Sequence, residues 1–259
     1  MPPTLAPTLA PDVVVDHVAD GLLRVAHGPV NLYVAHDDTS VGLVDAGLPA
    51  TYPVVEEVLR LLGFRTADLT AVLVTHGHFD HLGFARRLQQ DHDVPVLVHP
   101  GDGHLAAHPY GYRPHRNRFA FAATHPGGWR HLAAMTRLGA LAVRPPLRTE
   151  PLAEGVVADF PGRPEVLLTP GHTDGHVVLH FPAADAVVTG DALVTLDPYT
   201  GLRGPRVVAT GATNDPTTAV ASLERIGATG ARTVLPGHGD PWYDGAAAAA
   251  GRAATAGAA

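Results

Sequence analysis

Three histidines and one aspartate fall within six positions of the segment VTHGHFDHLG, residues 74–83: they are His76, His78, Asp80 and His81. Histidine and aspartate are uncommon in hydrophobic cores, yet this cluster directly follows the apolar run AVLV. In an extended turn after a strand, side chains two positions apart point to the same side, so His76 and His78 can hold one ion. Asp80 and His81 lie further round the turn and can reach a second ion about 3.5–4 Å away. The spacing predicts a metal site.

Three more donors follow apolar runs later in the chain, each with a glycine beside it or nearby. His172 stands in LLTPGHTDGH, Asp191 in AVVTGDA and His238 in TVLPGHG. Glycine lets the backbone turn sharply, and loops at strand ends are the usual place for functional side chains on a rigid scaffold. The seven donors offer only nitrogen and oxygen, with a carboxylate available to bridge, which suits a pair of borderline cations.

The elements that must position these donors follow from hydrophobic periodicity and turn residues. Strands are expected at residues 21–28, 30–36, 40–47, 71–75, 94–99, 166–170, 176–181, 186–191 and 232–239. Helices are expected at residues 53–63, 83–91 and 216–228, with helix-like pieces near 101–107 and 127–139. Strands come first and then alternate with helices, an order that favours a layered α/β sandwich over a doubly wound sheet.

The cluster at residues 76–81 resembles the H-x-H-x-D-H signature of the metallo-β-lactamase superfamily at every position. The later histidine, aspartate and histidine follow in the order typical of that family, and the early VDAG segment, with Asp45, is similar to its first short motif. The resemblance extends from about residue 20 to residue 240. It implies a single-domain α/β fold that is a four-layer αββα sandwich, with a site at one edge of the sandwich.

The resemblance also implies how the ligands divide between two zinc ions, with iron or a mixed pair as the other possibilities. One ion would be held by His76, His78 and His172. The other would be held by Asp80, His81 and His238, with Asp191 as the bridge. A water shared by two zinc ions ionises near neutral pH, and the hydroxide would attack a carbonyl. Asp80 would also orient or shuttle the proton, whereas Asp45 is expected to hydrogen-bond beneath the site.

Composition along the chain predicts the domain organisation. We expect a flexible N-terminal tail at residues 1–11, one metallo-hydrolase domain at 12–245 and an Ala/Gly-rich helix or tail at 246–259. The middle of the domain, about 99–150, is expected to be a helical, lid-like insert.

Four residues are candidates for substrate contact. Tyr112, Arg113 and Arg116 lie in the insert, and arginine can bind a carboxylate with two hydrogen bonds; surface ion pairs are the alternative role for the arginines. Tyr199 follows Asp191 by eight positions. Lactonases of the resembled family use a tyrosine after that aspartate, at a different offset, to contact the substrate carbonyl. Tyr199 is therefore a candidate catalytic residue beside Asp80 and Asp191.

Composition also narrows the chemistry and the partners. The 259 residues include no lysine and no cysteine, which excludes Schiff-base and thiolate catalysis. A net charge of −7 speaks against a nucleic-acid partner. Without a run of about 18 apolar residues or a signal-peptide pattern at the start, we expect no membrane span and a cytoplasmic location. The expected protein is a monomer or homodimer that acts on a small molecule.

Differences from the residue patterns of known subfamilies narrow the range of reactions that the protein could catalyse. Asp191 is present and lysine is absent, which argues against antibiotic hydrolysis, and the residues after His238 are too few for the glutathione-binding helical domain of glyoxalase II enzymes. A stand-alone dinuclear zinc hydrolase of a lactone, ester, thioester or amide is the leading interpretation. The alternatives are a persulfide-dioxygenase-like oxidoreductase with one iron on His76, His172 and Asp191, and a metal-stabilised binding protein without activity.

Overall fold

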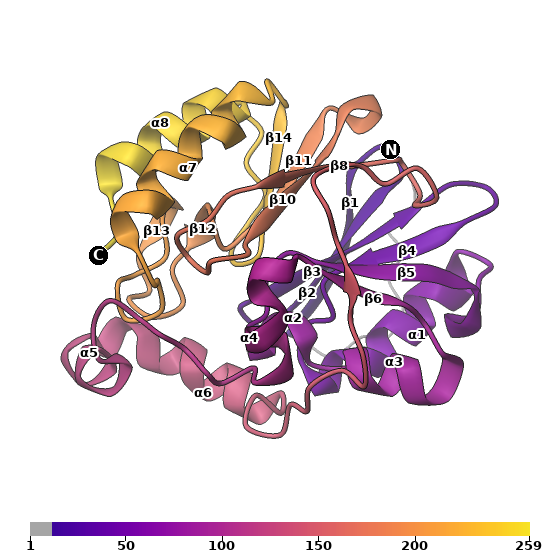
Figure 1. The fold of residues 1–259 in the computed structure, drawn as a ribbon, viewed down its shortest axis with the longest axis horizontal. Helices are drawn as coiled ribbons and strands as arrows, with labels where there is room; N and C mark the ends of the chain where they lie inside the picture. Colours follow the sequence, from indigo (N-terminus) through magenta and orange to yellow (C-terminus); the bar gives the residue numbers. More distant parts are fainter. Residues whose placement is uncertain (1–11) are drawn as a thin grey trace.

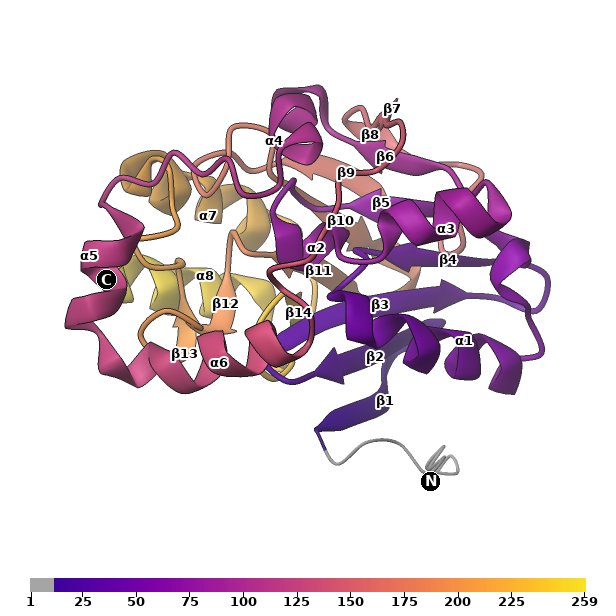
Figure 2. The same ribbon diagram turned by 90° about the horizontal axis from the view of Figure 1, so that it is seen from below.

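The computed structural model describes residues 12–259, so the tail expected at residues 1–11 lies outside the described part of the chain. Two mixed β-sheets lie face to face, and helices cover the outer face of each (Figure 1, Figure 2). The four αββα layers and the single domain expected from the resemblance are confirmed.

The first sheet has seven strands in sequence order, antiparallel from β1 to β4 and parallel from β4 to β7. Because parallel neighbours need a crossover, helices α1 (Tyr52–Leu61) and α3 (Ala85–His92) connect its parallel strands and cover its outer face. The strands are β1 Val13–Ala19, β2 Leu22–His27, β3 Val30–His36, β4 Val41–Val44, β5 Leu69–Val74, β6 Val96–Val98 and β7 Glu150–Pro151.

The second sheet has five strands in the order β14-β11-β10-β9-β8. Helices α7 (Pro216–Ala228) and α8 (Ala246–Ala256) pack against its outer face. Of the two alternatives for the C-terminal segment, helix or tail, the structure has the helix. The strands are β8 Gly155–Val156, β9 Glu165–Leu168, β10 Val177–Phe181, β11 Ala186–Gly190 and β14 Thr233–Pro236. A separate two-stranded ribbon consists of β12 Val194–Leu196 and β13 Arg203–Arg206.

Strand β5 shows how sequence alternation builds the core and delivers the metal-binding segment. Val72 and Val74 pack against the helix layer, whereas Ala71 and Leu73 face the second sheet, because successive side chains of a strand point to opposite faces. Both faces are covered, so residues 71–74 are all apolar, as expected for a buried parallel strand. The segment that follows it therefore starts from a rigid, fully buried position.

The remaining helices are short. Residues 99–150 contain η3 Pro100–Asp102, α4 Gly103–Ala107, α5 Arg118–Thr124, η4 Pro126–Gly128 and α6 Trp129–Arg137, with α5 and α6 along the lower edge of the sandwich in Figure 1. Elsewhere the chain forms η1 Pro49–Thr51, η2 Thr66–Asp68, α2 Phe79–Leu82 and η5 Pro182–Ala184. Among the helices of residues 12–259, none has the length and apolar character needed to cross a bilayer.

Five strands of the structure were not predicted from the sequence: β1, β7, β8, β12 and β13. Strand β1 is an edge strand with Asp16 and His17 at its centre and mostly half-exposed side chains, so it has no clear apolar alternation. Strands β7 and β8 have two residues each, and β13 contains both glycine and proline. Backbone pairing with a neighbour, rather than side-chain pattern, defines these elements.

Candidate metal centre

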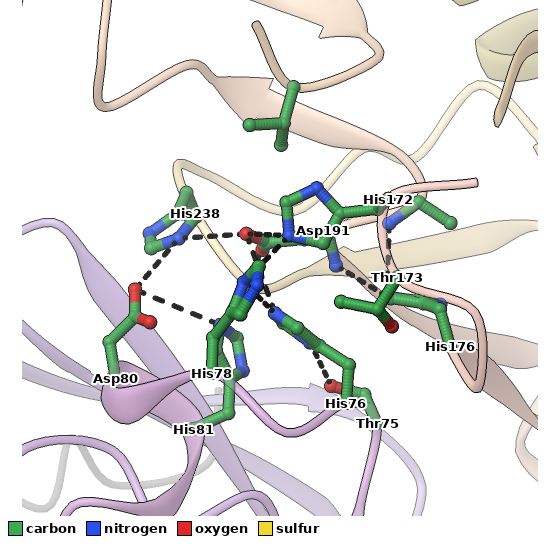
Figure 3. A network of polar contacts seen from close by, with 12 residues as sticks. Thr75, His76, His78, Asp80, His81, His172, Thr173, His176, Asp191 and His238 are labelled. Atoms are coloured by element: carbon green, nitrogen blue, oxygen red, sulfur yellow. Dashed lines mark hydrogen bonds and ion pairs between the residues drawn. The ribbon is translucent and has the colours of Figure 1, made fainter. Parts of the chain in front are cut away.

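All seven donors expected from the sequence gather at one edge of the sandwich, where loops of both sheets meet (Figure 3). Four come from the segment after β5, which includes α2, and three from the loops after β9, β11 and β14. All are buried. The donors are His76, His78, Asp80, His81, His172, Asp191 and His238.

The first group of donors consists of His76, His78 and His172. Nδ1 of His78 lies 3.1 Å from Nε2 of His76 and 3.0 Å from Nε2 of His172. Two nitrogens on one tetrahedral zinc ion, each about 2.0–2.1 Å from it, are about 3.3 Å apart. The three nitrogens therefore have nearly the spacing that a single ion requires.

The second group consists of Asp80, His81 and His238, and the carboxylate of Asp191 lies between the two groups. Oδ2 of Asp80 lies 3.4 Å from Nε2 of His238 and 3.9 Å from Nε2 of His81. Oδ2 of Asp191 lies 3.3 Å from Nε2 of His238 and 3.5 Å from Nε2 of His172, which belongs to the first group. One carboxylate thus contacts both groups, as a bridging ligand does.

The inner atoms of this centre fit metal binding. Within residues 12–259, Nε2 of His81, Nε2 of His238 and Oδ1 of Asp191 are buried and make no hydrogen bond. Buried polar atoms without partners are rare and cost free energy. Two cations with affinity for imidazole and carboxylate would satisfy these atoms, so the residues present form a candidate dinuclear site.

The outer nitrogens of the same histidines are held by the protein. Nδ1 of His238 donates to the carbonyl of Pro29 at 2.7 Å, and Nδ1 of His81 donates to Asp45 at 2.7 Å. A neutral imidazole has a proton on one nitrogen only, so each bond leaves the inner Nε2 with a free lone pair. The outer contacts therefore select the tautomer that binds metal.

Burial and nearby charges shift the histidine pKa values of the two groups in opposite directions. Burial lowers the pKa of His76 and His78 well below the usual range and that of His172 to about 4, so these side chains are neutral ligands at neutral pH. At His81, burial would also lower the pKa, but the surrounding carboxylates, Asp45 foremost, together raise it to about 9. Without metal, the second group therefore holds a proton that a cation would displace.

A family model agrees with this geometry. The model described as "Metallo-beta-lactamase superfamily" matches residues 25–238, which contain all seven donors. The chain belongs to the metallo-β-lactamase superfamily.

Individual members show how far the likeness extends. The "Probable metallo-hydrolase YflN" of Bacillus subtilis is 28% identical over 77% of this chain and 75% of its own length. The metallo-β-lactamase family protein TTHA1429 of Thermus thermophilus has the same fold, with a TM-score of 0.65 and 24% identity over 95% of this chain and 79% of its own. TTHA1623, solved in a di-iron-bound form, is 28% identical with a TM-score of 0.59 over 83% of this chain and 89% of its own. The chain is thus related to probable metallo-hydrolases of the superfamily.

His176 lies close to the candidate metal centre but is not one of its donors. Its Nε2 accepts hydrogen bonds from the backbone amides of Asp191 at 3.0 Å and Ala192 at 3.1 Å, and its Nδ1 contacts Thr169 at 3.0 Å. Both nitrogens are occupied, so His176 positions the backbone of Asp191 and is not a candidate ligand. His180, the other histidine of this segment, is half-buried on β10 near Glu165.

Gly237 shows how tightly the loops of the centre meet. A Cβ atom at this position would lie 2.5 Å from Oδ1 of Asp191 and 2.9 Å from Cε1 of His81. Real Cβ atoms do not approach other atoms this closely, so a side chain here would displace two of the candidate donors, Asp191 and His81, together. The glycine before His238 is therefore required by close approach.

Asp45 lies beneath the site, as expected, and is not a ligand. Its backbone has a φ of 65°, a strained conformation for a residue with a side chain. Oδ1 accepts from the Thr75 amide at 2.8 Å, and Oδ2 accepts from His81 at 2.7 Å. The carboxylate therefore joins the end of β5 to the second group of donors.

Asp102, in the insert, is a further supporting residue that the sequence analysis did not identify. This buried carboxylate accepts from the Gly77 amide at 2.8 Å, from the Thr173 hydroxyl at 2.7 Å and from the Gly175 amide at 2.7 Å. It thereby joins the loop of His76 and His78 to the loop of His172. Its sequence context, HPGD, offers no signal, because the bonds form only when the two loops meet.

The candidate substrate residues separate into two sets. The ring of Tyr112 lies against that of His78, with centroids 3.9 Å apart, and Tyr112 and Tyr199 line one cavity of about 310 Å³. Arg113 and Arg116 are exposed and do not line this cavity; Arg113 borders a separate cavity of about 120 Å³. The arginine at the larger cavity is Arg118. Sequence spacing could not show which arginine of this irregular segment turns towards the centre.

Two glycines of the insert, Gly127 and Gly128, pack directly against the loop that carries Tyr199. A Cβ atom at Gly128 would overlap the carbonyl oxygen of Tyr199, and one at Gly127 would overlap the carbonyl oxygen of Thr200. Backbone therefore packs on backbone at this contact, and η4 holds the loop that carries Tyr199 (residues 197–202).

We expect Asp45→Asn to weaken binding at the second group of donors selectively. Asparagine has one acceptor oxygen, so it cannot accept from both Thr75 and His81. Outer partners of ligand histidines contribute about 10–100-fold in metal affinity. A two-step zinc titration with a chromophoric chelator should therefore show one step weakened by at least about tenfold. Two unaltered steps would contradict this role of Asp45.

We expect Asp102→Asn to weaken the other step of the same titration, because an amide nitrogen would face a backbone donor of one loop or the other. The loss should be about tenfold and should concern the group of His76, His78 and His172. The matched control is Asp174→Asn, at an exposed neighbouring carboxylate, which should bind metal like the wild type. Equal effects of the two substitutions would contradict the assignment.

Proposed function

We propose that the protein is a dinuclear zinc hydrolase that cleaves a lactone, ester, thioester or amide in a small molecule. The observation that carries this proposal is the position of Asp191, whose carboxylate contacts donors of both groups. Two-metal hydrolytic sites hold their ions about 3.5–4 Å apart, often with a shared carboxylate. A site for a single ion would not need the second group of donors.

Zinc ions bound at such a site supply a nucleophile from water near neutral pH and polarise the carbonyl of the substrate. One ion would be held by His76, His78 and His172. The other would be held by Asp80, His81 and His238, with Asp191 shared.

Asp80 is the residue best situated to hold the proton released by the attacking water. Its carboxylate lies 3.4 Å from Nε2 of His238, and, after burial, its charge contributes to the raised pKa of Tyr199 and Tyr112. It therefore lies close to the other metal ligands and to the two tyrosines. A carboxylate in this position can accept a proton and pass it to the leaving group.

Tyr199 and Tyr112 would contact the substrate rather than the metal. Burial foremost, together with the carboxylate of Asp80, raises the pKa of both hydroxyls well above the usual range, so both remain protonated. The hydroxyl of Tyr112 is buried and makes no hydrogen bond within residues 12–259. A protonated hydroxyl beside the centre can donate to the carbonyl oxygen of a substrate as negative charge develops on it.

The test of this proposal combines metal analysis with a panel of esters, lactones, thioesters and amides. Purified protein should contain about two zinc ions per chain and hydrolyse at least one class. His76→Ala and Asp191→Ala should abolish turnover while far-UV circular dichroism stays unchanged, because both donors lie on loops and not within a helix or strand. Unchanged turnover in either variant at equal metal content would refute the assignment.

Iron is the second candidate metal, because TTHA1623 was solved in a di-iron-bound form. One iron per chain with oxygen uptake on a persulfide would favour the oxidative alternative, with His76, His172 and Asp191 as ligands. Metal-replete protein that turns over nothing in either assay would favour a binding protein.

We expect Tyr199→Phe to lower kcat by about tenfold or more while metal content and KM change little. The substitution removes a hydroxyl that would stabilise charge in the transition state but leaves the ring that lines the cavity. Stopped-flow or steady-state kinetics on the best substrate of the panel measure the effect. A loss confined to KM would assign Tyr199 to substrate binding alone.

A further inference from the structure

The cavity of about 310 Å³ beside the metal centre has an almost wholly apolar lining. Most of its walls come from α5, α6 and the segments that join them to the sandwich, and the remainder from Phe79, Tyr199 and Gly211. Its volume lies at the lower end of the range for small-molecule sites. The apolar side chains of the insert that line it are Tyr110, Tyr112, Phe119, Leu132, Met135 and Leu141.

This cavity lies next to the metal centre, and Phe79 and Tyr112 form the wall between them. Phe79 lies between the ligands His78 and Asp80 in the sequence and contributes to the wall. The ring of Tyr112 lies against His78 on one side and lines the cavity on the other. The rings of Phe79 and Tyr110 stack with centroids 5.5 Å apart. A molecule in the cavity would therefore contact the residues that pack against the first group of donors.

The charge of the lining is also informative. Among the described residues 12–259, Arg118 is the one charged side chain of the lining, and no carboxylate lines the cavity. The guanidinium lies over aromatic rings, 5.3 Å from the Tyr112 centroid and 4.9 Å from that of Phe119, and donates to the carbonyl of Tyr110 at 3.3 Å. A cationic group would be repelled there, and an uncharged apolar group would be accepted.

The apolar lining continues to the surface. Phe119 is 73% exposed and Leu141 is 78% exposed, and both line the cavity. Large apolar side chains this exposed at the mouth of a cavity are typical of a binding site. The apolar surface thus extends from solvent to Phe79 and Tyr112, which pack next to the metal centre.

We propose that this cavity binds an uncharged apolar chain of the substrate, of up to about ten carbons, taking each carbon group as similar in volume to a water molecule at about 30 Å³. The inference deepens the proposed function and rests on it: the carbonyl at the end of the chain would lie beside the metal centre. It selects medium-chain esters, thioesters or alkyl lactones from the broader classes named above.

The first experiment measures kcat/KM of zinc-loaded protein for two series of esters. One series varies the acyl chain from two to eight carbons with a fixed leaving group, and the other varies the alcohol chain with a fixed acetyl group. Each buried methylene contributes about fourfold, so one of the two series should rise by at least about tenfold. The rise should disappear in Thr136→Trp, which fills the cavity from α6.

The matched control is Arg137→Trp, the next residue of the same helix, which does not line the cavity. It should keep the dependence on chain length. Equal kcat/KM for short and long chains in both series would overturn the inference while leaving the hydrolase proposal intact.

The second experiment measures binding without catalysis. Isothermal titration calorimetry with decanoate, on the metal-free and the zinc-loaded protein, should show one site in the wild type and in Arg137→Trp and a loss of at least about tenfold in affinity in Thr136→Trp. If decanoate binds in this pattern but no ester is hydrolysed, the cavity assignment stands and the hydrolase proposal fails. If decanoate binds the wild type and Thr136→Trp equally, the cavity assignment fails.

Discussion

The structure depends on one contact, the carboxylate of Asp191 held between two groups of buried histidines. Every other feature of the centre supports that position: His176 accepts from the Asp191 amide, Gly237 leaves room for the carboxylate, and the loops after β9 and β14 bring His172 and His238 to its two sides. Buried donors of this kind are tolerable only when their inner atoms gain a partner, so the fold and the cations it would hold are thermodynamically coupled.

The two sheets make this contact possible because the first contributes four of the donors and the second contributes three. The first sheet supplies the segment after β5, and the second supplies the three later loops. The hydrogen bonds of Asp102 join the two halves at the level of their backbones. Small relative shifts of the sheets would therefore separate the donors, and the apolar interface between the sheets acts as the frame of the metal centre.

The sequence predicted the layers and all seven donors, because buried strands and an ordered ligand motif leave strong local signals. Helix α7 begins and ends as expected, with Asp215 as its N-cap. Features that leave no local pattern were missed: edge strand β1, the bonds of Asp102, and the position of Arg118 rather than Arg113 or Arg116 at the cavity. Strand β1 is half-exposed and has no apolar alternation. The partners of Asp102, by contrast, lie 25 to 73 residues away in the chain.

The backbone contact of Gly127 and Gly128 with the carbonyls of Thr200 and Tyr199 has a consequence for how such an enzyme can diversify. This close backbone contact joins the helices that line the cavity to the loop that carries Tyr199. New substrate preferences acquired by remodelling the helices would thus tend to move the hydroxyl as well. In this scaffold, substrate selectivity and turnover rate would therefore change together during evolution and not independently.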